Sequence, residues 1–182
     1  MLGHGFLRGA PAGRPLRRQG RSHGADVVTA SIRVADEADL PGVLALYAQP
    51  ALDNGNVLPL EAAKAVFARF AAYPDYRLFV AVEDGAGGEA IVGTYALLVM
   101  DNIGHLGTPS AIIEDVAVAP GRQGEGIGRA MMAHAIEEAR ARGCYKAVLS
   151  SNARREAAHA FYEGIGFTRH GYSFRVELEP TA

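Results

Sequence analysis

The sequence predicts a mixed α/β (α+β) fold, and two patterns carry that prediction. Residues 78–82 and 90–100 are apolar or β-branched and are separated by the turn Asp-Gly-Ala-Gly-Gly, which is typical of an antiparallel hairpin. Residues 111–118 form a further strand-like segment, which leads through a glycine-rich turn into apolar residues at helical spacing. A hairpin followed by strands that flank helices indicates a sheet with helices packed on it.

Length and composition are those of one globular domain. The chain has 182 residues, a size at which one core buries roughly two-thirds of the unfolded surface. Its net charge is −2, 49% of its residues are hydrophobic, and no apolar run approaches the roughly 20 residues of a membrane helix. The domain also lacks the strongly basic balance of nucleic-acid-binding proteins. We therefore expect neither a membrane nor a nucleic acid as partner.

Cys144 is the single cysteine of the chain. An internal disulfide is thereby excluded, which fits a cytoplasmic location. A lone cysteine is also a poor metal site, so no metal is expected. Because Cys144 lies between Gly143, which is expected to end a helix, and an apolar strand, we predict that it packs in the core.

Residues 1–29 differ in composition from the rest of the chain. They contain five Arg, several Gly and Pro, a single acid (Asp26) and no apolar periodicity. We expect a disordered or weakly ordered basic leader, followed by one domain over residues 30–182. A basic arm for nucleic acid or acidic surfaces and a transit peptide are alternatives. The segment shows no amphipathic helix and no secretory apolar core, which favours a dispensable leader.

Local signals predict the first elements of the domain. Residues 31–34 are typical of a short strand, after which Asp36 offers an N-cap for an amphipathic helix that ends before Pro50. Pro59 and Glu61 then open a second helix with apolar residues along one side. The hairpin follows this helix.

A polar loop at residues 101–110 leads into the strand at 111–118, and the glycine-rich turn follows at 118–128. The helix behind the turn has apolar residues at spacings of three and four, which define one buried face: Met131, Met132, Ala135, Ile136 and Ala139. A strand, a glycine turn and a helix N-terminus surround an anion, typically a phosphate, with unpaired backbone N–H groups. We therefore predict a phosphate-binding turn.

Three phosphate-binding patterns share such a turn and differ in their spacing. The Walker pattern requires a lysine after Gly126, where this chain has Ile127. The dinucleotide pattern would place its third glycine on Arg129. The pattern that remains is Q-x-x-G-x-G, from Gln123 to Gly128.

This spacing from Gln123 is the acyl-CoA pyrophosphate signature of the GNAT superfamily of N-acetyltransferases, which the chain resembles over most of residues 32–178. Residues 113–118 and 143–146 are similar to the corresponding stretch of glucosamine-phosphate N-acetyltransferases and related bacterial members. Residues 151–167 look like the last characteristic motif of the superfamily.

The resemblance implies acetyl-CoA as co-substrate and a single domain with a mixed, centrally splayed β-sheet flanked by helices. The strand at 111–118 would be splayed from a parallel strand at 147–150, with pantetheine between them. The backbone of Val116 and Val118 would pair with the pantetheine arm. The pyrophosphate would lie against the backbone of the turn, at Gln123, Gly124, Gly126, Gly128 and Arg129.

Three polar side chains near this turn have two interpretations each. Arg122 and Arg129 would add positive charge for the phosphates, or would be ordinary solvated surface residues. Asn152 matches a family position whose side chain often contacts the cofactor, and it would also suit the start of a helix. We keep cofactor contact as the prediction for Asn152.

The resemblance also implies the catalytic groups. Tyr162 matches the tyrosine that faces the thioester sulfur, where a neutral phenol can protonate the departing thiolate. A core tyrosine is the alternative. Glu114 and Asp115 are candidate bases for the amine; their side chains are expected on opposite faces of the strand, and Glu114 is preferred by analogy. A backbone N–H near Val116 would stabilise the oxyanion if a bulge turns it inward.

We therefore predict an N-acetyltransferase that moves an acetyl group from acetyl-CoA to a primary amine of a small molecule by direct attack in a ternary complex. A protein N-acetyltransferase and a non-catalytic acyl-CoA sensor are the alternatives. The acceptor site is expected to be walled by Tyr47, Asn54, Asn56 and the loop at residues 101–110. His105 and His159 are expected to be structural. The family often forms homodimers through C-terminal strands, which would correspond to residues 174–178.

Overall fold

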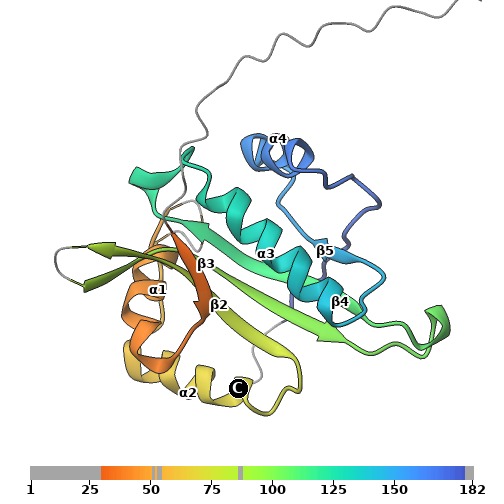
Figure 1. Cartoon of the computed structure of the whole chain (residues 1–182), viewed down its shortest axis with the longest axis horizontal. Helices are drawn as coiled ribbons and strands as arrows, with labels where there is room; N and C mark the ends of the chain where they lie inside the picture. The colour runs from red at the N-terminus through yellow and green to blue at the C-terminus, as the bar shows by residue number, and fades with distance from the viewer. Residues whose placement is uncertain (1–29, 51, 53–54, 86–87, 179–182) are drawn as a thin grey trace, which may run out of the picture.

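A five-stranded sheet runs through the centre of the computed structural model, which describes residues 30–50, 52, 55–85 and 88–178 (Figure 1). The strands lie side by side in chain order: β1 (Ser31–Val34), β2 (Tyr76–Gly85), β3 (Gly88–Met100), β4 (Ser110–Val118) and β5 (Ala147–Leu149). Neighbours from β1 to β4 are antiparallel, whereas β4 and β5 are parallel. The predicted hairpin and mixed sheet are confirmed. The predicted leader at residues 1–29 lies outside the described residues.

Helices cover both faces of this sheet (Figure 1). They are α1 (Leu40–Tyr47), preceded by the short 3-10 helix η1 (Glu37–Asp39), then α2 (Leu60–Phe70), α3 (Ile127–Ala141) and α4 (Glu156–Gly164). Side chains alternate along β2, so that Leu78 and Val80 pack with α1 while Phe79 and Ala81 pack with α3. The sheet therefore separates two cores, and each core belongs to one group of helices.

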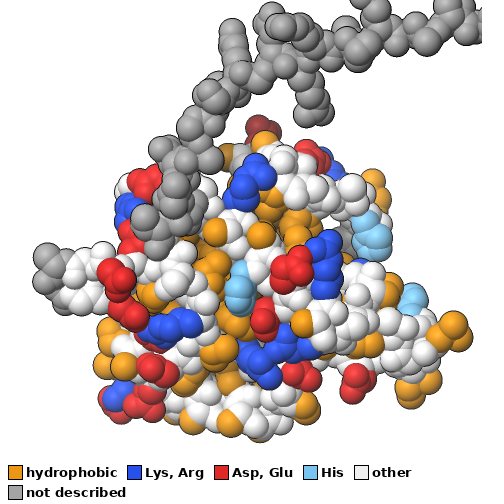
Figure 2. Space-filling view, in the orientation of Figure 1, with side chains coloured by type: hydrophobic (Ala, Val, Ile, Leu, Met, Phe, Trp, Pro, Cys, Tyr) orange, Lys and Arg blue, Asp and Glu red, His pale blue; other side chains and the backbone are white. Residues whose placement is uncertain are grey.

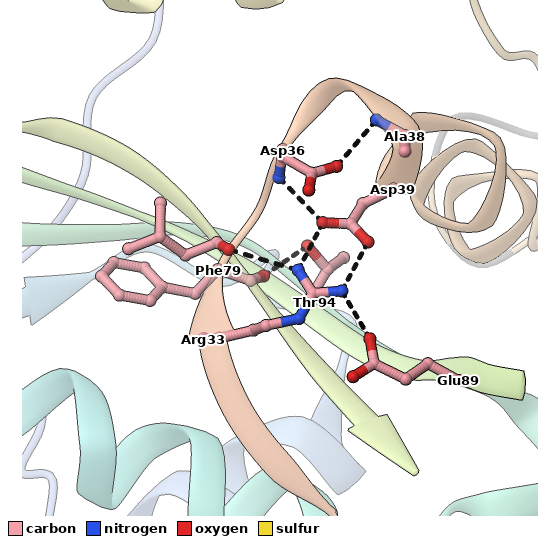
Figure 3. Close-up of polar contacts among 8 residues, drawn as sticks. Arg33, Asp36, Ala38, Asp39, Phe79, Glu89 and Thr94 are labelled. Carbon is pink, nitrogen blue, oxygen red and sulfur yellow. Dashed lines mark hydrogen bonds and ion pairs between the residues drawn. The ribbon is translucent and has the colours of Figure 1, made fainter. Parts of the chain in front are cut away.

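A polar network holds the start of α1 against the sheet (Figure 3). The guanidinium of Arg33 on β1 donates to both carboxylate oxygens of Asp39, at 2.7 and 2.9 Å, and to Glu89 on β3 at 2.8 Å. Asp39 also accepts from the backbone N–H of Asp36, whose own carboxylate caps Ala38. The hydrogen bond from Arg33 is the main reason why the pKa of Asp39 is lowered, so the pair stays ionised at neutral pH. Asp36 is confirmed as a helix cap, but the helix it caps is η1, and the N-cap of α1 is Asp39.

The end of α3 also follows the sequence prediction. Gly143 has φ +70°, a left-handed conformation that glycine adopts without a steric penalty. The backbone N–H groups of Gly143 and Cys144 donate to the carbonyls of Arg140 and Ala139, at 2.9 and 3.0 Å, which closes the helix with a Schellman motif. Cys144 is half-buried and packs against the α3 side of the core.

The sheet opens between β4 and β5. Their pairing runs from Ala111 opposite Ala147 to Ile113 opposite Leu149, and there β5 ends. β4 continues to Val118, and along this stretch no described strand pairs with it on the β5 side. β4 therefore has an unpaired edge at the place where the family resemblance implied a central splay.

The chain after α4 differs from the expectation. The strand that the resemblance implied at residues 174–178 is not formed, because this segment has no neighbouring strand to share backbone hydrogen bonds. The alternate apolar side chains of residues 172–178 are instead almost fully exposed: Tyr172, Phe174, Val176 and Leu178. Apolar side chains also project at the loop between β3 and β4, where Ile103 and Leu106 are exposed (Figure 2).

Charges on the face shown in Figure 2 are mixed, with basic and acidic side chains interspersed among apolar ones. None of the helices within the described ranges is both long enough and apolar enough to cross a membrane.

Candidate active site

The glycine turn presents a helix N-terminus that no side chain caps. Gly124 and Gly126 have φ +88° and +89°, backbone angles that residues other than glycine rarely adopt. Gly126 is the N-cap of α3, and the first intrahelical bond runs from the N–H of Ala130 to its carbonyl. The N–H groups of the first turn therefore have no intrahelical partner, and they lie at the positive end of the helix dipole. This arrangement suits a phosphate.

The two arginines of the turn differ in their surroundings. Arg122 donates to Glu83 on β2 at 2.9 Å and to Glu125 at 2.7 Å, so its charge is already neutralised. Arg129 is exposed at the start of α3 and makes no ion pair with any described residue. The sequence offered the same two interpretations for Arg122 and Arg129. In the structure only Arg129, of these two, is available to an anion.

Gly128 has a packing role that the spacing of the motif did not reveal. A Cβ at this position would lie 3.1 Å from Cζ of Phe161 on α4, closer than ordinary van der Waals contact. Glycine therefore lets α4 approach the N-terminal turn of α3. The same approach brings the neighbouring Tyr162 to this end of the sheet.

The open edge of β4 fits an extended polar arm. Val116 and Val118 are half-buried and pack against the α3 side of the core. Just beyond β5, the buried hydroxyl of Ser151 has no hydrogen-bond partner in the described chain. A strand edge without a neighbour and an unsatisfied buried hydroxyl are both groups that a bound ligand can satisfy.

A β-bulge interrupts β4 at the centre of this region. Thr94 pairs with Ala117 and Ala96 pairs with Glu114, so the one residue between them on β3 faces two residues on β4. The bulged residue is Asp115, with φ +54°. The sequence could not establish this bulge, because nothing in residues 113–118 marks it.

The prediction that the two carboxylates lie on opposite faces of the strand is wrong, because of the bulge. Glu114 stands opposite Ala96, which belongs to the core on the α1 side. Asp115 lines a cavity together with Ala96 and Leu78 on that same side. Strict alternation would have put the two carboxylates on opposite faces, but the extra residue of the bulge puts both on one face. Partial burial raises the pKa of Glu114, and the nearby Asp115 raises it further.

Tyr162 packs on the other face of the sheet. It is half-buried on α4. Its ring centroid lies 5.1 Å from that of Phe161 and 5.8 Å from that of Phe167. Burial is the main reason why the pKa of its phenol is raised, and Arg155 opposes this effect. The phenol therefore carries its proton at neutral pH and can donate it.

Asn152 shapes the turn that leads into α4. Its side-chain oxygen accepts a hydrogen bond from the backbone N–H of Arg154 at 2.9 Å, and its carbonyl oxygen accepts from Arg155 at 2.9 Å. His159 Nε2 lies 3.0 Å from the same carbonyl oxygen, so His159 supports this turn. Contact between Asn152 and a cofactor stays a prediction.

Only some of the residues that were expected to line the acceptor site lie around one cavity. Tyr47 and Asn56 line the cavity that contains Asp115, whereas no residue of the loop at 101–110 does so. Asn54 lies outside the described residues. His105 stacks on Tyr145 with ring centroids 4.4 Å apart, away from this cavity.

A thioester carried on a long, phosphate-bearing arm is the ligand that suits the turn, the open β4 edge and the Tyr162 phenol, and the fold is that of an acyltransferase. The model of the acetyltransferase (GNAT) family matches residues 40–167, and the chain belongs to this family. GNAT acetyltransferases use acetyl-CoA as co-substrate. Over the described ranges no group of three or more His, Cys, Asp or Glu side chains could hold a metal ion.

The similarity to proteins of named activity extends over more than two thirds of the chain. The chain is 31% identical over 153 residues to the glucosamine 6-phosphate N-acetyltransferase of Trypanosoma brucei brucei, covering 84% of this chain and 99% of that protein. It is 29% identical over 123 residues to the aminoalkylphosphonate N-acetyltransferase of Salmonella typhimurium, covering 68% and 77% of the two chains. The crystal structure of a Trypanosoma brucei acetyltransferase superposes with a TM-score of 0.68 at 31% identity, covering 82% of this chain and 99% of that one.

Proposed function

We propose that this acetyltransferase moves an acetyl group from acetyl-CoA to a primary amine of a small molecule, by direct attack in a ternary complex. One observation supports the proposal above others: the carboxylates of Glu114 and Asp115 lie on one face of the sheet and the phenol of Tyr162 packs on the other. A thioester held in the opening between β4 and β5 would be reached by the amine from one face and by a proton donor from the other.

The proposed cofactor contacts follow the geometry of the opening. Pantetheine lies along the free edge of β4, where the backbone of Val116 and Val118 pairs with its amides. The pyrophosphate lies at the uncapped N-terminus of α3. The residues assigned to the pyrophosphate are Gln123, Gly124, Gly126, Gly128 and Arg129, and Asn152 is proposed as a separate contact of the cofactor.

Each proposed chemical step uses a group of the chain. Glu114 takes a proton from the ammonium group, directly or through water, and the nitrogen lone pair then forms a bond to the thioester carbonyl carbon. The backbone N–H of Val116, beside the bulge, donates to the oxyanion. The carbon–sulfur bond then breaks and Tyr162 gives its proton to the departing thiolate. The nitrogen, still carrying one proton too many for an amide, releases it to water, from which the Tyr162 phenolate regains its proton.

A test of the function needs two measurements on the purified chain. Calorimetric titration with acetyl-CoA measures binding, and a thiol-release assay over a panel of amines measures transfer. We expect micromolar binding, and thiol release that depends on the amine. Binding without release from any small amine or peptide would support the acyl-CoA sensor, and release from peptides alone would support a protein N-acetyltransferase.

Glu114→Gln is expected to lower kcat/KM by about 10²-fold or more, because the amide cannot accept the proton. The pKa of Glu114 is raised, so the wild type should lose its base as the pH falls through that raised value. This loss toward low pH should disappear in Glu114→Gln. The measurement is the pH profile of kcat/KM for one amine in both proteins.

Asp115→Asn serves as the matched control for this profile. Removing the charge of Asp115 removes one cause of the raised pKa of Glu114, so the low-pH loss should remain and move to lower pH. Protonation of the amine itself affects all the variants alike. A Glu114→Gln enzyme with the wild-type rate and profile would exclude Glu114 as the base.

We also propose that the exposed segment at residues 172–178 pairs with a second copy of the chain. Apolar and polar residues alternate along this segment, the apolar side chains are exposed, and the segment joins no described strand of the sheet, which is the pattern of a strand that lacks its neighbour. Phe174→Asp is expected to convert a dimer into a monomer in sedimentation velocity, whereas Ser173→Asp should not. A wild type that sediments as a monomer would contradict the pairing.

A further inference from the structure

A cavity of about 510 Å³ lies between the α1–α2 layer and the sheet. Its walls are mostly apolar side chains of these helices and of β2, among them Phe67, Phe70 and Leu78. Val57 and Leu58 also line it and are themselves 44% and 49% exposed, so apolar surface continues out to solvent. Small-molecule sites have volumes in this range and a similar lining.

One charged side chain lines this cavity among the described residues, and it is negative. The described lining residues include the carboxylate of Asp115 and no Lys, Arg or His. The segment that joins α1 and α2, residues 48–59, also contains no Lys, Arg or His in the sequence. Lys64 on α2 is engaged with Glu37 and Glu61. Phosphate recognition uses guanidinium or ammonium groups, whereas carboxylates attract a cation and repel an anion.

Aromatic rings connect the cavity to the two carboxylates. The ring centroids of Phe67 and Phe70 are 5.7 Å apart, and those of Phe70 and Tyr76 are 4.3 Å apart. Tyr76 lies close enough to the bulge that Asp115 and Glu114 both add to the rise in its pKa, which burial mainly causes. A row of rings therefore runs from α2 to the place where the amine must lose its proton.

We propose that the acceptor is an amine with an uncharged apolar or aromatic body, such as an arylalkylamine. Its ammonium group lies beside Glu114 and Asp115, and its body fills the cavity against the row of aromatic rings. The inference rests on the proposed acetyl transfer and narrows its substrate. It separates this chain from the relatives named for anionic substrates, glucosamine 6-phosphate and aminoalkylphosphonate.

Binding can be tested without turnover. In calorimetry with coenzyme A present, 2-phenylethylamine should bind at least about 10-fold more tightly than glucosamine 6-phosphate, because the ring is buried and no phosphate is repelled. It should also bind at least about 10-fold more tightly than 2-phenylethanol, which lacks the ammonium charge. Equal or tighter binding of glucosamine 6-phosphate would overturn the inference.

A positive charge placed at the solvent-exposed edge of the cavity tests the preference between the two amines in the thiol-release assay. Leu58 is half-exposed, so Leu58→Arg should fold, and the new cation should shift the ratio of kcat/KM from 2-phenylethylamine toward glucosamine 6-phosphate by about 10-fold or more. Leu58→Gln is the matched control of similar polarity without charge, and it should shift the ratio less. Identical ratios in the two variants would count against the cavity as the acceptor site.

The two proposals fail in different ways. Thiol release that prefers glucosamine 6-phosphate over 2-phenylethylamine would overturn the substrate inference and leave acetyl transfer standing. Acetyl-CoA binding without thiol release from any amine would overturn acetyl transfer itself, whatever the calorimetry of 2-phenylethylamine shows.

Discussion

Tyr162→Phe is expected to lower the turnover of acetyl transfer by about 10²-fold or more, while the affinity for acetyl-CoA changes by a few-fold at most. The phenol is half-buried and its pKa is raised, so the wild-type side chain carries a proton that it can give to the thiolate. Phenylalanine keeps the contacts with Phe161 and Phe167 and removes only the donor. The measurements are steady-state kinetics of thiol release and calorimetry with acetyl-CoA.

Tyr145→Phe provides the matched control for this variant. Tyr145 stacks on His105 and is exposed, so the same loss of a hydroxyl occurs away from the opening between β4 and β5. It should leave turnover within about 2-fold. If Tyr162→Phe retained the wild-type turnover, Tyr162 would be a packing residue and another group would protonate the thiolate.

Gly126→Val is expected to weaken acetyl-CoA binding by at least about 10²-fold and to leave a folded protein. Gly126 has φ +89° at the N-cap of α3, a conformation in which a β-branched residue costs about 1–3 kcal/mol. Relief of this strain would turn the first N–H groups of α3 away from the pyrophosphate, and the new side chain would block its approach. Calorimetry measures the affinity, and circular dichroism checks the fold.

Gly121→Val is the control from the same turn. A Cβ at Gly121 meets no atom within 4 Å, and its φ is not in the left-handed region, so the same substitution there adds bulk without strain. Acetyl-CoA should bind to Gly121→Val with an affinity close to that of the wild type. Normal binding by Gly126→Val would refute the assignment of the turn to the pyrophosphate.

Local patterns in the sequence were sufficient to predict most of the helices and strands and the glycine-rich turn between β4 and α3. The cap at Asp36 and the helix end at Gly143 depend on backbone geometry within a few residues, and the structure contains both, with Asp36 capping η1 just ahead of α1. The hairpin and the buried face of α3 follow from short periodicities in the same way. The glycines at 124 and 126 have the positive φ that a close turn requires.

The tertiary structure alone decided which of the predicted groups meet. Asp115 shares a face with Glu114 because β4 pairs with β3 through a bulge, and a bulge depends on the match between two strands distant in the chain. Arg122 is neutralised by Glu83 from another strand, and residues 174–178 form no strand because no neighbour lies beside them. The composition of the cavity beside Asp115 has the same origin, since its walls come from α1, α2, residues 56–58, β2, β3 and β4. Sequence spacing determines what each segment forms, whereas long-range packing determines what each side chain faces.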